Sequence, residues 1–205
     1  MTQCFTQTLR SQRYTPAATT LPMNEEKNEG SPLLWFAMSA PYRRELKAKE
    51  NLAARGIDSF VPMTIAVAEE RGTKKRKTVP AIHNLIFVHT TKETIQRTKQ
   101  EIDYLQYRTT PCNGKNKPII VPDKAMTQFI AVTQERIEEL TYLKPEEINI
   151  ENGTRVRIHG GTFDGTEGIF VKIKGKRNKR VVVLIEGVAA VAINAEISPD
   201  LIEVL

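Results

Sequence analysis

The residues of this chain that could carry out catalysis are few and scattered. Its histidines are His83, His89 and His159, and its cysteines are Cys4 and Cys112. None stands in an HExxH, GxSxG or phosphate-loop context, and the sequence has no CxxC pair. A lone histidine is more often a surface or packed residue than a catalyst. We therefore predict a binding protein rather than an enzyme, with no catalytic residue, cofactor or metal site.

The charged residues are compatible with phosphate binding. Thirty Lys and Arg oppose 24 Asp and Glu, and the positive charge is concentrated in two runs, Lys74-Lys75-Arg76-Lys77 and Lys172 to Arg180. Such runs attract nucleic-acid backbones, although a solvated hairpin tip is an equal alternative for each. Further candidate nucleic-acid contacts surround the first predicted helix: Tyr42, Arg43, Arg44 and Arg55.

Composition is typical of a globular protein of the cytoplasm. The 205 residues are 40% apolar, which allows one sizeable domain or two small ones, and we expect two. No run of 18 apolar residues occurs, and the distant cysteines fit a reducing compartment. We predict a monomer without membrane contact. Residues 1–31 are expected to form a disordered tail, although residues 1–24 also resemble an organellar transit peptide.

Strands alternate with helices over residues 32–140, which predicts an α+β domain with an antiparallel sheet flanked by helices. The apolar run 33–38 predicts a strand buried on both faces. Tyr42, Leu46 and Ala53 recur at helical spacing and predict an amphipathic helix over 41–55. A basic hairpin is expected over 67–80, a core strand over 84–88 and a further strand over 102–108. A helix is expected over 90–100, with a capping box at Thr90–Glu93. The last expected helix follows Pro122, and its buried face carries Met126, Phe129, Ile130, Ile137 and Leu140.

A glycine-rich turn between two strand-like runs marks the second domain, over 152–205, after a charged linker at 141–151. Five short strands fit between Arg155 and Leu205. Phe163 has two interpretations: a plug in the core, which we favour, or an aromatic side chain presented to a partner. The segment from Gly153 to Val171 resembles a KOW motif, which occurs in small SH3-like barrels of transcription elongation factors and ribosomal proteins. Its motif residues are Gly153, Gly161, Phe163 and Gly168.

Taken together, the two predicted domains resemble the NusG family from about Leu33 to Leu205. The segments 35–38 and 84–88 carry this resemblance in the first domain, and the KOW motif carries it in the second. Within the family, the segments 117–123 and 181–188 look closest to specialised paralogues, the UpxY-type antiterminators of capsular polysaccharide operons and the more distant RfaH.

The resemblance implies binding to RNA polymerase. Such factors dock on the clamp helices of the largest subunit through a hydrophobic patch, which corresponds here to Ile82, Phe87 and Met126. Ser39 stands where RfaH has an aromatic residue. By spacing, a second polymerase contact falls on Gln96, Arg97 and Thr98, whereas the run His89-Thr90-Thr91 is better explained as a strand end and a helix cap.

The function implied is transcription antitermination: the factor bridges the polymerase cleft and suppresses pausing and termination on specific operons. Recruitment would use non-template DNA or leader RNA, and the KOW domain could bind a ribosomal protein. Two alternatives remain open, a housekeeping elongation factor of the same family and a KOW-containing RNA-binding protein associated with the ribosome. The strand and helix organisation of 33–134 favours a factor of the NusG family over a ribosome-associated protein, which would not need such a domain.

Overall fold

The computed structural model describes residues 31–205 except 71–72, 136, 144–152, 174–178 and 195–196. Residues Ser31–Leu205 form one compact unit. The predicted tail lies almost wholly outside the described residues, as do most of the predicted linker and the middle of the second basic run.

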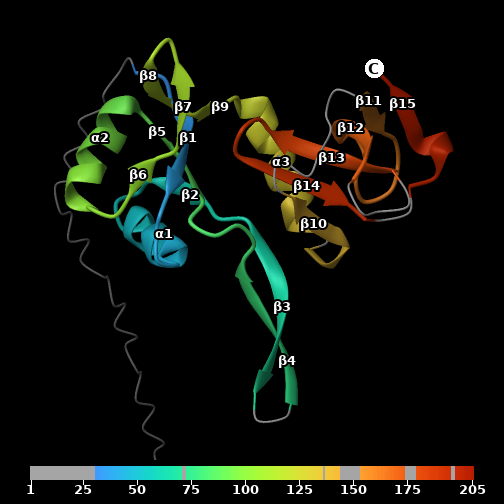
Figure 1. Ribbon diagram of the computed structural model, residues 1–205, viewed down its shortest axis with the longest axis horizontal. Helices are drawn as coiled ribbons and strands as arrows, with labels where there is room; N and C mark the ends of the chain where they lie inside the picture. Colours follow the sequence, from blue (N-terminus) through green and yellow to red (C-terminus); the bar gives the residue numbers. More distant parts are fainter. Residues whose placement is uncertain (1–30, 71–72, 136, 144–152, 174–178, 195–196) are drawn as a thin grey trace, which may run out of the picture. The chain divides into compact units, whose positions relative to one another are not determined.

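An antiparallel sheet, called sheet A, organises the first domain (Figure 1). Its central strand β1 (Leu34–Ser39) pairs with β5 (Ile86–Thr90), so that Ala37 lies opposite Phe87. The strand order is β2-β5-β1-β6, and β9 also pairs with β1; these strands are β2 (Asp58–Phe60), β6 (Gln106–Tyr107) and β9 (Ile120–Val121). The predicted strand over 102–108 is therefore wrong in extent, because only two of its residues pair.

Both faces of sheet A are covered, as predicted for a strand buried on two sides. Helices α1 (Glu45–Ala53) and α2 (Lys92–Glu101) cover the face that carries Phe36, Met38 and Ile86. The opposite face carries Ala37 and Phe87 and packs with α3 (Asp123–Glu135). Alternate residues of β1 thus enter two separate hydrophobic clusters.

Helix α1 begins later and buries a different face than predicted. Tyr42 and Arg43 have φ of 61° and 57°, so the chain passes through a turn before the helix starts at Glu45. The buried residues are Glu45, Ala48 and Leu52, whereas Leu46 is 42% exposed. The predicted inward face at Leu46 is therefore wrong. The buried position at the start of the helix is a carboxylate, which apolar spacing does not reveal.

Helix α2 confirms the predicted element but shifts its cap by one residue. The N-cap is Thr91, whose hydroxyl accepts a hydrogen bond from the Thr94 backbone N–H at 3.2 Å. The helix ends at Glu101, close to the predicted end. Thr90 is instead the last residue of β5, where it is buried.

A two-stranded hairpin leaves sheet A between β2 and β5 (Figure 1). Its strands are β3 (Met63–Glu70) and β4 (Thr73–Pro80). The hairpin therefore begins at Met63, before the predicted start at residue 67. Pro62 separates β2 from β3, because proline lacks the N–H that a continuous ladder needs. A second, shorter hairpin joins β7 (Thr109–Cys112) and β8 (Lys115–Pro118).

A six-stranded antiparallel sheet, called sheet D, forms the second domain. Its order is β10-β14-β13-β12-β11-β15. The five strands predicted after residue 155 are β11 (Thr154–Ile158), β12 (Glu167–Lys172), β13 (Lys179–Ile185), β14 (Ala189–Ile193) and β15 (Ile202–Val204). They are consistent with the predicted SH3-like KOW domain.

The sixth strand comes from the segment that joins the domains. Strand β10 (Leu140–Leu143) follows the short helix η1 (Ile137–Glu139) and pairs with β14. The helix face predicted to continue to Ile137 and Leu140 therefore stops with α3. The first residues of the predicted linker, 141–143, lie in a strand of sheet D.

Candidate binding surfaces

The residues predicted to dock on polymerase lie together but are not exposed. Phe87 and Met126 are fully buried, and Ile82 is half-buried against the same hydrophobic cluster. The Phe87 ring packs edge-on against Phe129 of α3, with centroids 5.9 Å apart. The expectation of an exposed patch is therefore wrong for this conformation.

Sheet D completes the cover of this cluster. Helix α3 packs against β1 on one side and β13 on the other, and Figure 1 shows it between the two sheets. The cluster that holds Phe87 and Met126 continues into Val181 and Val183 of β13 and Ile193 of β14. One apolar core thus belongs to both domains, which we call the shared core.

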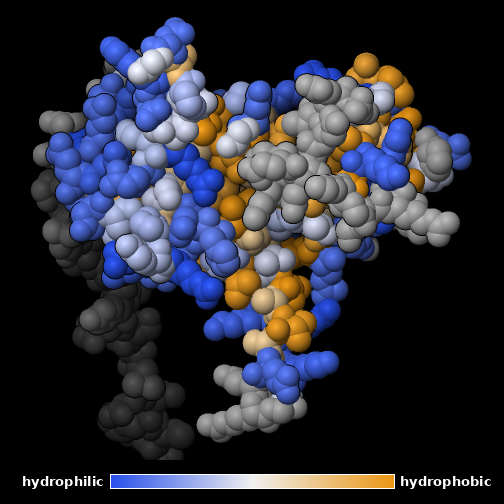
Figure 2. Space-filling model, in the orientation of Figure 1, coloured by the Kyte–Doolittle hydropathy of each residue, from blue (hydrophilic) through white to orange (hydrophobic). Residues whose placement is uncertain are grey.

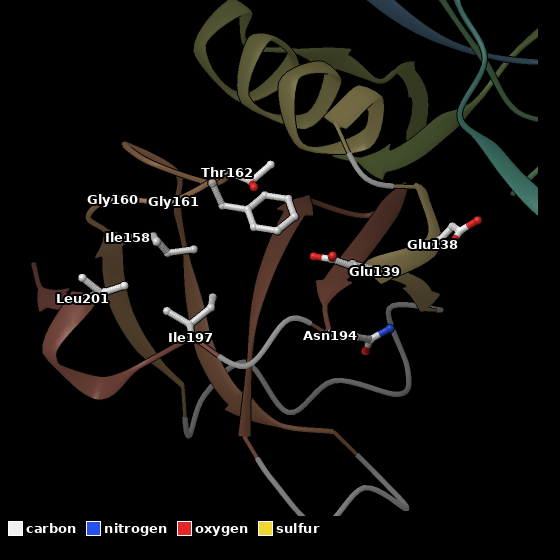
Figure 3. A pocket seen from close by; sticks show the side chains of 10 residues that line it. Glu138, Glu139, Ile158, Gly160, Gly161, Thr162, Asn194, Ile197 and Leu201 are labelled. Carbon is white, nitrogen blue, oxygen red and sulfur yellow. The ribbon is translucent and has the colours of Figure 1, made fainter.

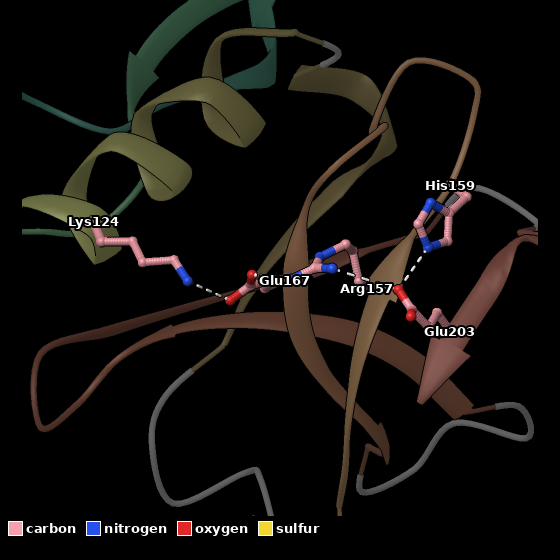
Figure 4. A network of polar contacts seen from close by, with 5 residues as sticks. All are labelled: Lys124, Arg157, His159, Glu167 and Glu203. Carbon is pink, nitrogen blue, oxygen red and sulfur yellow. Dashed lines mark hydrogen bonds and ion pairs between the residues drawn. The ribbon is translucent and has the colours of Figure 1, made fainter. Parts of the chain in front are cut away.

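Polar contacts join α3 to sheet D at the edge of the shared core (Figure 4). Lys124 Nζ lies 2.9 Å from Glu167 Oε2, and Arg157 Nη2 donates to the other carboxylate oxygen at 2.8 Å. The hydrogen bonds from Arg157 and Lys124 lower the pKa of Glu167 to about 2. The network continues to Glu203, which contacts Arg157 at 3.5 Å and His159 at 2.8 Å. His159 is thus part of a surface network of polar contacts.

Two contacts join the basic hairpin to η1 and to β10, the strand of sheet D that follows it. The Tyr142 hydroxyl of β10 donates to the Met63 carbonyl at 3.2 Å, and burial raises the pKa of Tyr142 to about 12. Arg76 of β4 lies 2.7 Å from Glu138 of η1. Neither Tyr142 nor Glu138 was a sequence candidate, because nothing in local spacing indicates a contact across more than 60 residues.

The second predicted polymerase contact does not form one surface. Gln96 and Arg97 are exposed on α2, whereas Thr98 is buried and its hydroxyl donates to the Thr94 carbonyl at 2.8 Å. The Thr98 side chain is therefore used within the fold, and only its two neighbours can meet a partner.

The turn before α1 presents an aromatic and two arginines. Tyr42 is 84% exposed, and the Arg44 guanidinium lies 5.7 Å from the Tyr42 ring centroid and 5.0 Å from that of Tyr104. Asn51 of α1 donates to the Tyr104 hydroxyl at 3.0 Å. Tyr104 was not among the sequence candidates, because it lies more than 50 residues from Asn51 in the chain. Stacked aromatics and guanidinium groups are able to hold an unpaired base.

The remaining candidates near α1 are held by partners within the fold. Arg55 lies 2.9 Å from Glu101 and also donates to the Asn51 carbonyl, so it joins α1 to α2 rather than completing the Tyr42 group. Glu45 accepts a hydrogen bond from the Asn84 backbone N–H. That bond fixes the start of α1 against the loop before β5.

The basic hairpin is exposed along its predicted candidates, Lys74 to Lys77. Figure 2 shows hydrophilic residues over the α1 and α2 side of the molecule, and apolar residues gathered near sheet D and the base of the hairpin. Residues 63–80 include no aromatic side chain. Its chemistry is that of phosphate contact rather than base stacking.

The glycine turn of the KOW motif packs inward. Phe163 is buried, as the favoured interpretation predicted, and lies in the shared core cluster. Phe163 lines a pocket of about 520 Å³. Figure 3 shows Gly161 and Thr162 of the turn on one side of this pocket, and Glu139 and Asn194 on the other. Gly161 has φ of 70°. Gly168 serves close packing, because a Cβ there would lie 2.7 Å from Val181 Cγ1 and 2.8 Å from the Val182 carbonyl oxygen. Gly153 is half-buried.

Two further observations bear on chemistry. Within the described ranges, no group of three or more His, Cys, Asp or Glu side chains lies together as a metal site requires. Across the same part of the chain, no helix has both the length and the apolar character needed to cross a membrane.

The fold defines a class of architecture: an α+β domain followed by an all-β domain that is consistent with an SH3-like fold. Residues 33–130 match the family model described as "Transcription termination factor nusG". Among solved structures, the chain is similar to one titled "Domain interaction in Thermotoga maritima NusG", with 20% identity and a TM-score of 0.40 over 79% of this chain and 93% of that chain. Comparison with curated proteins gives no match.

Proposed function

We propose that this protein is a transcription factor that binds RNA polymerase through its first domain and suppresses pausing and termination, on specific operons of the polysaccharide type. The observation that carries the proposal is the match of residues 33–130 to the NusG family model. The mechanism needs no bond chemistry, because preferential binding to the actively elongating conformation is sufficient to shift its population.

The polymerase contact is assigned to the apolar face of β5 and α3, with Ile82, Phe87 and Met126 against the clamp helices of the largest subunit. An apolar face of this kind suits an amphipathic helical partner. Because the shared core covers that face, docking requires sheet D to separate from α3. Once separated, sheet D is free to bind a second partner, for which a ribosomal protein is the candidate.

Nucleic-acid contacts direct the factor to its operons. The Tyr42, Arg44 and Tyr104 group is assigned to an unpaired base of non-template DNA or leader RNA, since its rings and guanidinium offer stacking surfaces. Arg43 is exposed on the same turn and is assigned to the adjoining phosphate.

Retention of core RNA polymerase by the immobilised full chain tests the proposal. The chosen variant is Ile82→Asp, because Ile82 is only half-buried, whereas a charge at Phe87 would also disrupt the core. Leu46→Asp is the control, since Leu46 is exposed on the other side of sheet A. We expect Ile82→Asp to lose polymerase and Leu46→Asp to keep it, with equal unfolding midpoints. Equal retention would refute the assigned face, and no retention by the unaltered chain would refute the proposed function.

An in vitro transcription assay tests the direction of the effect. Addition of the chain is expected to raise readthrough of a terminator and shorten pauses on a template that carries its recruiting sequence. Increased termination on that template would contradict the proposal.

A further inference from the structure

Two charged side chains hold the backbone of the loop before β5, residues 81–84. The Asn84 N–H donates to the Glu45 carboxylate, and Arg108 Nη2 donates to the Asn84 carbonyl at 3.2 Å. Asn84 has φ of 60°, a left-handed conformation that asparagine tolerates better than most residues. The same loop carries Ile82, which the proposed function places against polymerase.

Glu45 is an expensive residue for the start of α1. It is completely buried. Its Oε1 accepts the Asn84 hydrogen bond, and its Oε2 has no hydrogen-bond partner among the described residues. A buried carboxylate with one oxygen unpaired is unfavourable, whereas an apolar side chain of similar size would avoid that desolvation. The need to hold the Asn84 N–H, rather than the packing of α1, therefore accounts for a carboxylate at this position.

Arg108 reaches the loop from the segment between β6 and β7. Its side chain is half-buried, and desolvation lowers its pKa. Nη2 lies 3.4 Å from the His83 carbonyl oxygen in addition to its shorter contact with Asn84. The Arg108 backbone N–H donates to the Ala37 carbonyl of β1 at 2.9 Å. An anion on α1 and a cation joined to β1 thus hold the donor and the acceptor of one residue, Asn84.

We propose that Glu45 is a positioning residue for polymerase binding, which acts through Asn84 to keep Ile82 in place. Ile82 is half-buried against the shared core and lies two residues before Asn84, so a change in the Asn84 backbone would move it. Glu45 itself is buried and cannot contact a partner. A loop that is already ordered avoids the entropy cost of ordering on contact. This inference rests on the proposed function for the identity of the partner.

Amide hydrogen exchange of the full chain tests the loop without polymerase. Glu45→Ala removes the acceptor and should speed exchange of the Asn84 amide by about tenfold or more, as expected for the loss of a hydrogen bond to a charged group. Leu52→Ala is the matched control, because Leu52 is fully buried in the same helix. It should destabilise the domain while leaving the Asn84 amide more protected than Glu45→Ala does.

Retention of core RNA polymerase by the immobilised full chain gives the functional result. At a temperature where the variants are folded, Glu45→Ala should weaken retention by about tenfold, whereas Leu52→Ala should keep it. Glu45→Gln, which still offers an oxygen to the Asn84 N–H, should recover part of the loss. Because Glu45 acts through Ile82, the double variant Glu45→Ala with Ile82→Ala should bind about as weakly as Ile82→Ala alone.

Three outcomes would overturn the inference. Unchanged exchange at Asn84 in Glu45→Ala would show that the carboxylate does not hold the loop. Equal losses of polymerase in Glu45→Ala and Leu52→Ala would indicate an effect of stability alone, and additive losses in the double variant would show that Glu45 does not act through Ile82.

A second variant covers the case in which Glu45→Ala does not fold. Arg108→Met removes the guanidinium from the half-buried side chain and leaves the Glu45 hydrogen bond in place. The same weaker retention, and the same lack of additivity with Ile82→Ala, are expected of it. Failure of the unaltered chain to retain polymerase would refute the proposed function and this role with it. Retention by the unaltered chain, together with any of the three contrary outcomes, would refute the positioning role alone.

Discussion

The two faces of sheet A are covered by different parts of the chain. The face that carries Phe36 packs with α1, α2 and the residues around them, all between residues 34 and 107. The face that carries Phe87 packs with α3 and continues through the shared core to Ile193 of β14. The first is the core of one domain, whereas the second depends on two domains remaining together. The proposed polymerase contact lies on the second face, where a partner could replace sheet D.

Removal of the Phe129 ring, on the face shared by the two domains, should cause the largest loss in the free energy of unfolding. Phe129 is fully buried and packs against the rings of Phe87 and Phe60. Phe129→Ala should lower the free energy of unfolding by about 3–5 kcal/mol, measured by urea denaturation with Trp35 fluorescence and circular dichroism. Because the core is shared, both probes should shift. A loss below about 1 kcal/mol would show that α3 does not depend on this packing.

Truncation of a buried side chain on the Phe36 face of sheet A should lower the free energy of unfolding by nearly as much. The packing that it disturbs lies within the first domain. Leu52 of α1 is fully buried, whereas Leu46 is 42% exposed. Leu52→Ala should therefore cost about 2–5 kcal/mol, while Leu46→Ala stays within about 0.5 kcal/mol. The same urea denaturation measures both. A larger loss at Leu46 would restore the helix face that apolar spacing predicted.

Sequence reasoning succeeded where local pattern determines structure. The five strands after residue 155, the strand at β1, the basic hairpin and the burial of Phe163 follow from alternation, turn residues and apolar runs. The start of α1 did not follow, because Tyr42 and Arg43 adopt positive φ without being glycine. The burial of Glu45 depends on the Asn84 backbone, 39 residues away.

The binding surfaces were less predictable for the same reason. The group at Ile82, Phe87 and Met126 was identified by resemblance, but its burial results from packing against α3 and against β13 and β14 of the second domain. Tyr104 beside Arg44 and Glu138 beside Arg76 are likewise contacts between distant segments. Periodicity within one element carries no information about such pairs.

A methyl group at Gly168 tests how closely sheet D must pack to supply its half of the shared core. A Cβ there would lie 2.7 Å from Val181 Cγ1, so Gly168→Ala should cost about 1–3 kcal/mol by overpacking. Gly161→Asn is the control, because nothing lies within 4 Å of a Cβ at Gly161 and asparagine tolerates positive φ. Thermal unfolding compares the two, and equal midpoints would mean that β12 and β13 can move apart.

Acid titration of Glu167, at the edge between the domains, should give the smallest change in stability. Hydrogen bonds from Arg157 and Lys124 lower the pKa of Glu167 from 4.5 to about 2, so the folded state favours the ionised carboxylate. Its stabilising contribution is complete above pH 4.5 and is lost as the pH falls toward 2. The unfolding midpoint of Glu167→Gln should therefore depend less on pH in this window than that of the unaltered chain.

Lys124→Met separates the contact between domains from the one within sheet D. It removes the α3 partner of Glu167 and leaves the Arg157 hydrogen bond, so an intermediate pH dependence is expected. If Lys124→Met matched the unaltered chain, the depressed pKa would arise within sheet D alone. The two domains would then be held together by the shared core, and a partner that competes for that core would meet no electrostatic barrier to release.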